Sequence, residues 1–348
     1  MERRQFVKGA AAAIGAVAYG AHGPLTLAQE AEQQDTALAK TRRIVRAVSV
    51  SFKSNVGVQT VVPLARIADR VDREAEQGTD LIILPEHCQG CNDRSEETLD
   101  GPTITAMARL ARKHRTYIVC PIDRKDGEMR FNSSVLLNRE GKVVCIYDKV
   151  YPVYPNECEM HPPIRPGDLA RVYKADFGKV GFATCFDVNW TSLWRKLSYL
   201  GAELVVFPSA YSAGRSLQAH AIDYNYYVMS STRIPDCRVY DIDGELLVHD
   251  LENSGNGVNV TRVQLDMDRC IFHQDGNMPG KLNRLLQDHG NDVEREKWLP
   301  MEGWFVLRAK HSGVSAKELA KQYGLETLRH YINRSQCEID QCRGWEFA

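Results

Sequence analysis

Beyond its N-terminal segment, the chain alternates short runs typical of β-strands with runs typical of amphipathic helices. Residues 44–52 alternate apolar with polar or small side chains, whereas residues 62–77 place apolar side chains on one face at helical spacing. A short apolar run at 81–84 predicts a buried strand, and Pro102 begins a second helix. A glycine turn within residues 133–147 predicts a β-hairpin. This order of strands, helices and hairpins predicts an α/β layered sandwich rather than an all-parallel sheet.

The second half of the chain continues the alternation. Its apolar runs predict a strand pair around Gly178, a helix that ends at Gly201, and a further strand and helix before a strand-rich end. After about residue 283 the sequence becomes rich in charge, and residues 310–348 predict a C-terminal helical extension. The remaining predicted elements are strands at 117–121, 172–177, 179–184, 203–208, 238–240, 246–248 and 257–265, and helices at 191–200, 217–229 and within 315–335.

Residues 1–28 have the layout of a signal peptide. A basic start that includes Arg3 and Arg4 is followed by a weakly apolar Ala/Gly-rich stretch and then by small residues. The paired arginines, with the apolar pair and the lysine after them, resemble a twin-arginine export signal, which predicts a periplasmic location. The alternative is an Ala-rich helix that begins with basic residues. We take residues 29–43 as a linker and expect the main domain at 44–309.

The charge balance argues against two classes of partner. Lys and Arg total 44 and Asp and Glu total 45, so a net charge of −1 gives no electrostatic reason to expect nucleic acid or an anionic membrane. After the N-terminal segment, no apolar run has the length that a membrane-spanning helix needs. The ten cysteines fit an exported protein, in which disulfides persist, and their spacing leaves the pairing open.

Three residues that could act together in catalysis each follow a predicted strand. Glu86 follows the strand at 81–84. Lys149 follows the second strand of the hairpin, and Cys185 directly follows the strand at 179–184. Strand ends in layered α/β folds converge on one crevice, so these side chains can meet. A carboxylate can take the proton of a thiol, and a lysine charge can stabilise the oxyanion formed when the thiolate attacks, which predicts hydrolysis through an acyl-enzyme.

The sequence around these residues resembles the signature segments of a known family. Gly-Thr-Asp-Leu-Ile-Ile-Leu-Pro-Glu ends at Glu86, Tyr-Asp-Lys ends at Lys149, and Gly-Phe-Ala-Thr-Cys-Phe-Asp surrounds Cys185. From about residue 44 to 270 the chain is similar to the nitrilase superfamily of carbon–nitrogen hydrolases. The further segments that match in the same order are 132–134, 201–209 and 225–228.

The resemblance implies a four-layer αββα sandwich, the carbon–nitrogen hydrolase fold. It also implies a catalytic triad of Glu86, Lys149 and Cys185. Members of the family often carry a second glutamate in the loop after the lysine. Glu157 has the position seen in the amidase and nitrilase branches, Glu159 is the competing candidate, and a solvated loop carboxylate is the alternative for either.

The function that we expect is hydrolysis of a small linear amide or N-carbamoyl compound, without a metal or an organic cofactor. The backbone N–H of Phe186 is expected to complete the oxyanion site. The aspartate soon after the cysteine, Asp187, resembles the amide-hydrolysing branches more than the nitrilases. Nitrile hydrolysis and acyl transfer to an amine are alternatives with the same chemistry, and a catalytically silent exported binding or scaffold protein is the alternative from a different class. We also expect a homodimer or a larger homo-oligomer.

Two further motifs have competing interpretations. His87, Cys88 and Cys91 could supply three metal ligands, but the sequence offers no fourth, so a disulfide or two ordinary thiols are favoured. Residues 315–324 and the helix predicted after them mimic a helix-turn-helix. The export signal and the neutral charge favour a packing or dimer-stabilising hairpin over a DNA-binding one.

The export signal can be tested in the cell that makes the protein. Replacing both Arg3 and Arg4 with lysine keeps the positive charge but removes the paired arginines of the motif. We expect the double variant to stay in the cytoplasm as an uncleaved precursor, measured by cell fractionation and intact mass. An unchanged location would contradict a twin-arginine route.

Overall fold

The computed structural model describes residues 43–52, 62–90, 95–234, 236–250, 257–276 and 278–344. The predicted signal peptide, most of the linker and Cys91 lie outside these residues, so what we expect of them stays a prediction. Within the described part, no helix is long and apolar enough to cross a membrane.

Two six-stranded sheets form the centre of the fold. Sheet A has the strand order β12-β1-β2-β3-β4-β5 and sheet B the order β11-β10-β9-β8-β7-β6. In each sheet three adjacent strands are parallel, β1 to β3 and β7 to β9, and the strands outside them pair antiparallel. The strands are β1 Ile44–Phe52, β2 Leu81–Ile83, β3 Tyr117–Asp126, β4 Met129–Leu137, β5 Val143–Asp148, β6 Val172–Ala175, β7 Gly178–Phe182, β8 Leu204–Ser209, β9 Tyr227–Thr232, β10 Cys237–Tyr240, β11 Leu246–Asp250 and β12 Val258–Asp266.

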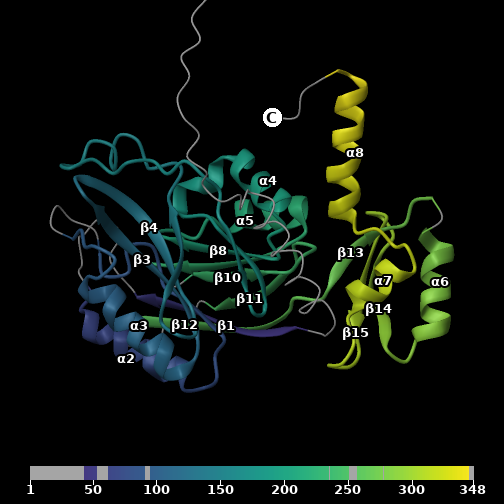
Figure 1. Cartoon of the computed structure of the whole chain (residues 1–348), viewed down its shortest axis with the longest axis horizontal. Coiled ribbons are helices and arrows are strands. Elements are labelled where there is room, and N and C mark those ends of the chain that lie inside the picture. Colours follow the sequence, from purple (N-terminus) through teal and green to yellow (C-terminus); the bar gives the residue numbers. More distant parts are fainter. Residues whose placement is uncertain are drawn as a thin grey trace, which may run out of the picture. The chain divides into compact units, whose positions relative to one another are not determined.

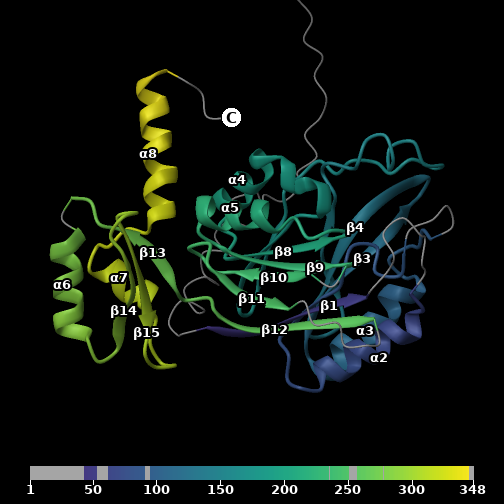
Figure 2. The ribbon, with the colours of Figure 1, turned by 180° about the vertical axis from the view of Figure 1, so that it is seen from behind.

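Helices cover the outer face of each sheet. α2 (Leu64–Ala75) and α3 (Pro102–His114) connect the parallel strands of sheet A, and α4 (Thr191–Tyr199) and α5 (Gly214–Tyr224) connect those of sheet B. Figure 1 shows α2 and α3 beyond one sheet and α4 and α5 beyond the other, and Figure 2 shows the same layers from behind. The fold is therefore an α/β layered sandwich, as the sequence pattern predicted, with the four αββα layers that the family resemblance implied.

The continuous apolar runs of the sequence are strands that are buried on both faces. Leu81 and Ile83 of β2 point into the cluster that lies between the sheets, whereas Ile82 points into the cluster beneath α2 and α3. Successive side chains of a strand alternate between its two faces, so a strand between two apolar layers needs an apolar residue at every position. This is why residues 81–84 lack the alternation that residues 44–52 show at their start.

One predicted helix is shorter than expected. The sequence favoured a helix at 217–229, but α5 ends at Tyr224 and Asn225 adopts a left-handed φ of 52°. Val228, which continues the apolar spacing of the helix, instead pairs with Val205 in the neighbouring strand. The prediction was wrong there because pairing with β8 outweighs local helical spacing.

A third sheet follows the sandwich. It has the order β13-β15-β14 and packs with α6 and α7 around a hydrophobic cluster of its own. The C-terminal extension thus begins near residue 270, whereas the sequence pattern placed it near 310. The charge-rich stretch of the sequence forms a strand with a solvated face. Its charged side chains obscured the apolar pattern that predicts a strand. The elements are β13 Cys270–His273, α6 Met278–His289, β14 Val293–Leu299, β15 Trp304–Ala309, α7 Ala316–Gln322 and α8 Leu328–Cys342.

A largely buried carboxylate, whose side chain is 14% exposed, ties this extension to sheet B. Glu203, just before β8, accepts from Nη2 of Arg43 at 2.7 Å and from Nζ of Lys317 in α7 at 2.6 Å. It also accepts the backbone N–H of Lys179 at 2.9 Å. Burial opposes ionisation, but the charges of Lys317 and Arg43 outweigh it and hold the pKa of Glu203 well below its usual range.

Removing this charge should destabilise the protein. We expect Glu203→Gln to lower the free energy of unfolding at pH 7 by about 3 kcal/mol, because two cations lose their buried partner. The pKa of Glu203 is lowered, so its stabilising contribution is complete above its ordinary pKa of 4.5 and is lost as the pH falls further. The difference between the two proteins, measured by urea denaturation, should therefore shrink on acidification.

An exposed ion pair provides the control for this variant. Asp69 and Arg73 on α2 pair at 3.1 Å with side chains 61% and 65% exposed. Asp69→Asn should change the free energy of unfolding by about 0.5 kcal/mol or less. Equal losses in the two variants would contradict the role given to Glu203.

Candidate active site

Glu86, Lys149 and Cys185 each follow the end of a strand. Glu86 comes shortly after β2 and Lys149 directly after β5, both in sheet A. Cys185 begins the short 3-10 helix η1 (Cys185–Asn189), which follows β7 in sheet B. The three residues are only 3%, 1% and 6% exposed, so their charges and the thiol interact with little screening by water.

The ammonium of Lys149 joins two carboxylates. Its Nζ lies 2.9 Å from Oε1 of Glu86 and 2.7 Å from Oε2 of Glu157. Burial favours the neutral amine, but the glutamates outweigh it and raise the pKa of Lys149 above its usual value. Of the two loop glutamates considered from the sequence, the structure thus brings Glu157 to the lysine and leaves Glu159 exposed.

Asn132 of β4 holds both glutamates in place. Its Nδ2 donates to Oε1 of Glu86 at 2.8 Å and to Oε1 of Glu157 at 2.9 Å. Nε2 of His87 lies 3.8 Å from the same oxygen of Glu157. Burial would raise the pKa of each carboxyl group, but Lys149 and His87 together bring both below their usual range. Both glutamates are therefore ionised at neutral pH.

Cys185 lies at a strained turn. Its φ of 49° is in the left-handed region, which a residue with a Cβ seldom adopts. Asp187 stabilises the turn, because its Oδ2 accepts the backbone N–H of Thr184 at 2.8 Å and the Thr184 side chain bonds back in a capping box. The backbone conformation at the cysteine is thus held by its neighbours in sequence. Phe186 is the second residue of this turn, and the role of its N–H as an oxyanion donor stays a prediction.

Asp187 also connects this turn to the strand that carries the lysine. Its Oδ2 accepts the hydroxyl of Tyr147 at 2.6 Å, and its Oδ1 accepts the backbone N–H of Tyr151 at 2.8 Å. Tyr147 and Tyr151 stand on either side of Lys149 in the sequence. Burial raises the pKa of Asp187 to about 6, although these hydrogen bonds oppose the shift. One carboxylate therefore fixes the cysteine turn of sheet B relative to the end of β5 in sheet A.

The thiol of Cys185 holds its proton at neutral pH. Burial and the negative charge of Glu86 raise its pKa well above the ordinary value of 9.0, while Lys149 and hydrogen bonds from the Ser209 side chain and the Ala210 backbone oppose the shift. Because Glu86 is ionised and the thiol is not, the proton must move during attack on a substrate rather than before it.

Aromatic side chains flank the nucleophile. The rings of Tyr151 and Trp190 stack with centroids 4.1 Å apart, and Phe186 meets Trp190 edge-on at 5.2 Å. Burial, with the charges of Cys185 and Glu86, raises the pKa of Tyr211 to about 12, which places its hydroxyl within electrostatic reach of the site. Tyr151, Phe186 and Trp190 are each half-buried.

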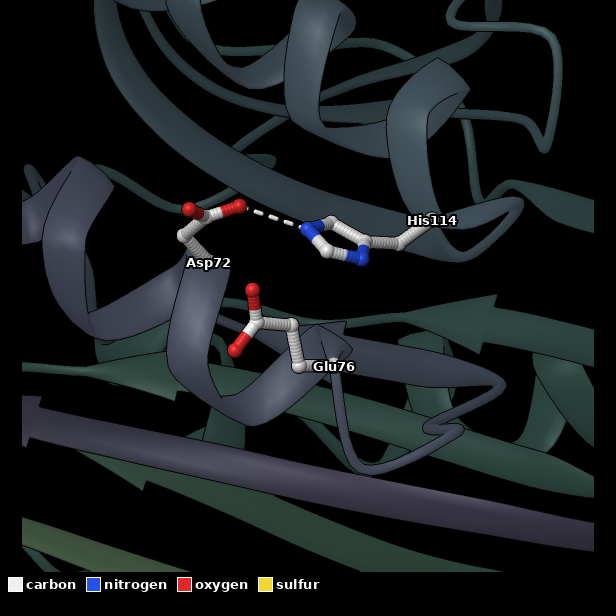
Figure 3. Close-up of side chains that lie close together, drawn as sticks. All are labelled: Asp72, Glu76 and His114. Atoms are coloured by element: carbon white, nitrogen blue, oxygen red, sulfur yellow. Dashed lines mark hydrogen bonds and ion pairs between the residues drawn. The ribbon is translucent and has the colours of Figure 1, made fainter.

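Among the described residues, three groups of acidic side chains and histidines are close enough to hold a metal ion. The ammonium of a lysine already contacts each of these groups. In the catalytic group this lysine is Lys149. In another group, Lys297 binds three carboxylates at 2.6–2.9 Å. Figure 3 shows the group that joins α2 to α3, which consists of Asp72, Glu76 and His114. Lys113 lies 2.7 Å from Asp72 of this group. An ammonium occupies the position of a cation in every case. The groups are Glu86, His87 and Glu157; Asp72, Glu76 and His114; and Asp241, Asp243 and Glu245.

The motif after Glu86 does not assemble into one ligand set in the part that the structure describes. His87 faces Glu157, whereas Cys88 shares a hydrogen bond with Cys120. Cys91 lies outside the described residues. The described cysteines are all free thiols.

Comparison with known proteins identifies the family. The family described as carbon–nitrogen hydrolase matches residues 29–271. The chain therefore belongs to the carbon–nitrogen hydrolase family, within the nitrilase superfamily.

Related proteins of known sequence are 27–29% identical to this chain over about half of its length. A nitrilase of Pyrococcus abyssi is 29% identical over 52% of this chain and 72% of its own length. An N-carbamoylputrescine amidase of Solanum tuberosum is 27% identical over 50% of this chain and 61% of its own length. The nitrilase and fragile histidine triad fusion protein NitFhit of Drosophila melanogaster is 27% identical over 49% of this chain, which spans only 41% of NitFhit.

A solved structure agrees in fold. A variant of the amidase of Nesterenkonia sp. AN1 in complex with butyramide superposes with a TM-score of 0.54 at 21% identity, covering 63% of this chain and 90% of the amidase. At this identity the likeness supports the αββα fold and nothing finer.

Four residues that hold the catalytic groups in place were not predicted to do so from the sequence. Asn132 and Asp187 lie within segments that carry the family resemblance. The sequence therefore indicated their positions but not their hydrogen-bond partners. Tyr147 is the first residue of the segment that ends at Lys149, and His87 directly follows the segment that ends at Glu86. Their roles depend on contacts across β4 and β5 and between the two sheets, which a linear sequence does not display.

The protonated state of Cys185 predicts a steep pH dependence of alkylation. We expect the rate of its reaction with iodoacetamide to rise about tenfold for each pH unit from 7 to 9, in proportion to the thiolate fraction. Ser209→Ala removes a hydrogen bond that lowers the pKa and should slow the reaction further. The measurement is mass spectrometry of the peptide that contains Cys185, with Cys185→Ser as the assignment control. A rate independent of pH would reveal a preformed thiolate and contradict this assignment.

Proposed function

We propose that the protein is an amidase or N-carbamoyl amidohydrolase that works through a cysteine acyl-enzyme. The observation that carries the proposal is the buried contact of Lys149 with Glu86 and Glu157 near the thiol of Cys185, because these groups supply a base, a fixed positive charge and a nucleophile. The family assignment supports the same class of reaction.

The first half of the proposed reaction forms the acyl-enzyme. Glu86 accepts the thiol proton as the sulfur of Cys185 attacks the carbonyl carbon, and the electron pair of the C=O bond moves onto oxygen. Lys149 and the N–H of Phe186 stabilise this oxyanion. When the intermediate collapses, the C–N bond breaks and the proton held by Glu86 passes to the leaving nitrogen, which departs as ammonia or an amine.

The second half releases the acid. Glu86, again ionised, takes a proton from a water molecule, whose oxygen attacks the thioester carbon. The C–S bond then breaks, the sulfur regains the proton from Glu86, and the carboxylic acid leaves. Glu157 holds the lysine in position through both halves, so that the positive charge faces the reacting carbonyl rather than water.

Several similarities support an amide or carbamoyl substrate. One relative is named as an N-carbamoylputrescine amidase, and another, from Mus musculus, as a deaminated glutathione amidase. In a variant of the Nesterenkonia amidase, the acetamide moiety of fluoroacetamide is attached to the active-site cysteine. The relative from Pyrococcus abyssi is named as a nitrilase, so nitrile hydrolysis is the second candidate, with acyl transfer as a variant of the same chemistry.

We further propose that the mature protein works after export, as a homodimer or a larger homo-oligomer. The paired arginines of the N-terminal segment support export. In an oxidising compartment Cys185 must stay reduced, and its 6% exposure protects it from oxidants that act on accessible thiols.

The assignment can be tested with a panel of linear amides, N-carbamoyl amines and nitriles. Cys185→Ser and Cys185→Ala should lose turnover of every compound that the wild type hydrolyses. Glu86→Gln should lower kcat/KM by about a hundredfold or more, because the base is lost. Since the pKa of Glu86 lies below 4.5, wild-type kcat/KM should not fall until the pH drops below about 4.5. Intact mass of the acid-quenched enzyme should report the acyl group on Cys185.

Matched variants separate catalysis from general damage. Glu157→Gln should reduce turnover strongly, whereas Glu159→Gln, two residues away and exposed, should leave it unchanged. Cys342→Ser, which alters an exposed cysteine, should also be silent. Full turnover by Cys185→Ser would refute the enzymatic assignment.

A further inference from the structure

A second cavity lies away from the proposed catalytic residues. It has a volume of about 610 Å³, within the range of small-molecule sites, and no member of the triad lines it. Glu203, at the start of β8, forms part of its wall, whereas Ser209 at the other end of β8 bonds Cys185. A six-residue strand spans roughly 16–20 Å, so the cavity is separate from the nucleophile.

The body of the cavity is apolar. Its buried side chains come from β9 and the turn after β10, from β13 and the segment before it, and from the turn between α7 and α8. An apolar wall of this kind accommodates a hydrocarbon or aromatic group that leaves water. The buried apolar and aromatic members are Tyr227, Ile242, Met267, Ile271, Phe272 and Leu325.

The two carboxylates of the lining are already neutralised by protein cations. Glu203 is bound by Arg43 and Lys317, as described above. Glu326 accepts hydrogen bonds from Nε and Nη2 of Arg334 at 2.9 and 3.0 Å. Neither acid therefore has charge left over to neutralise a further cation of the lining.

The lining contains more cationic side chains than these two acids can neutralise. Arg269 is matched by Asp241, with Nη2 at 2.9 Å from Oδ2, and by Glu296 at 2.6 Å. Arg329, in contrast, donates Nη1 to the backbone oxygen of Ala202 and has no carboxylate partner within the described ranges. Lys321, which also lines the cavity, has no carboxylate partner within the described ranges either. A guanidinium and an ammonium at the wall of one cavity are thus left for an anion.

The start of α8 adds to this positive field. Thr327, Arg329 and His330 of its first turn line the cavity, and the first turn contains no acidic residue. The N-terminus of a 15-residue helix carries partial positive charge, which ordinarily attracts acidic side chains and repels basic ones. Glu326, just before the helix, lies 3.5 Å from Nε2 of His330 and is bound by Arg334, so Arg329 is the cation of this turn that Glu326 does not pair.

We propose that this cavity is a binding site for a small organic carboxylate, whose carboxylate group pairs with Arg329 and Lys321 and whose apolar part packs against Phe272 and Leu325. The site is separate from the triad and does not depend on the proposed reaction. Arg329 offers the planar pair of donors that a carboxylate accepts, and Lys321 provides a second charge.

Binding can be measured by calorimetry with the full chain and hexanoate as the probe. We expect saturable binding of one hexanoate per chain, weaker binding of butanoate, and no binding of hexan-1-ol or inorganic phosphate. Arg329→Gln should weaken binding roughly tenfold or more, since one charge-assisted pair is lost. Lys321→Glu, at an exposed position that should not disturb folding, should abolish it.

Two controls decide where the probe binds. Arg343→Gln removes one positive charge at the other end of α8 and should leave the affinity unchanged. Cys185→Ser should also bind hexanoate like the wild type, whatever its effect on turnover. Hexanoate binding that persists in Lys321→Glu, that is lost in Cys185→Ser, or that is matched by phosphate would overturn the proposal, as would the absence of binding to the folded wild type.

Discussion

The structure of the site depends on the burial of one lysine charge between two carboxylates. An ammonium that is 1% exposed is tolerated only when opposite charges replace the water it has lost, and Glu86 and Glu157 do so at 2.9 and 2.7 Å. The two acids repel each other, so they in turn need Lys149 between them and the amide of Asn132 across them. Lys149 keeps Glu86 ionised although burial and the charge of Glu157 oppose it, whereas burial and the charge of Glu86 keep the nearby thiol protonated. This is the starting state that base-assisted attack requires.

The nucleophile belongs to the other sheet and depends on a different carboxylate. Cys185 adopts a left-handed φ, and its turn persists because Asp187 bonds the backbone before it and the Tyr147 hydroxyl across the sandwich. The distance between cysteine and lysine is thus set by the packing of sheet A on sheet B. Apolar side chains such as Phe182 and Leu81 fill the space between the sheets and hold that spacing, so precision at the site comes from the core as much as from the catalytic loops.

The C-terminal extension is a compact addition with its own core, and it is joined to the sandwich both by charge and by apolar side chains such as Ile271, Val306 and Leu328, which belong to the core cluster of the sandwich. Glu203 with Lys317 and Asp241 with Arg269 connect the two across buried contacts. Ion pairs of this kind specify geometry while contributing less to stability than apolar packing of the same area. The same charges surround the second cavity, where the cations exceed the available acids. A junction built in this way can both fix the extension in place and present a recognition surface.

The sequence by itself determined the αββα fold, the strand ends that carry Glu86, Lys149 and Cys185, and the family. These follow from local information: apolar periodicity, turn residues and short signature segments are all written within stretches of about ten residues. It did not determine that Glu157 rather than Glu159 meets the lysine, that Asn132 bridges the acids, or that Asp187 joins the two sheets. Nor did it reveal β14 and β15, whose charged faces hide the strand pattern, or the end of the helix before β9. Each of these was decided by contacts between residues distant in sequence, because the partner of a buried polar group depends on which strands and sheets pack together.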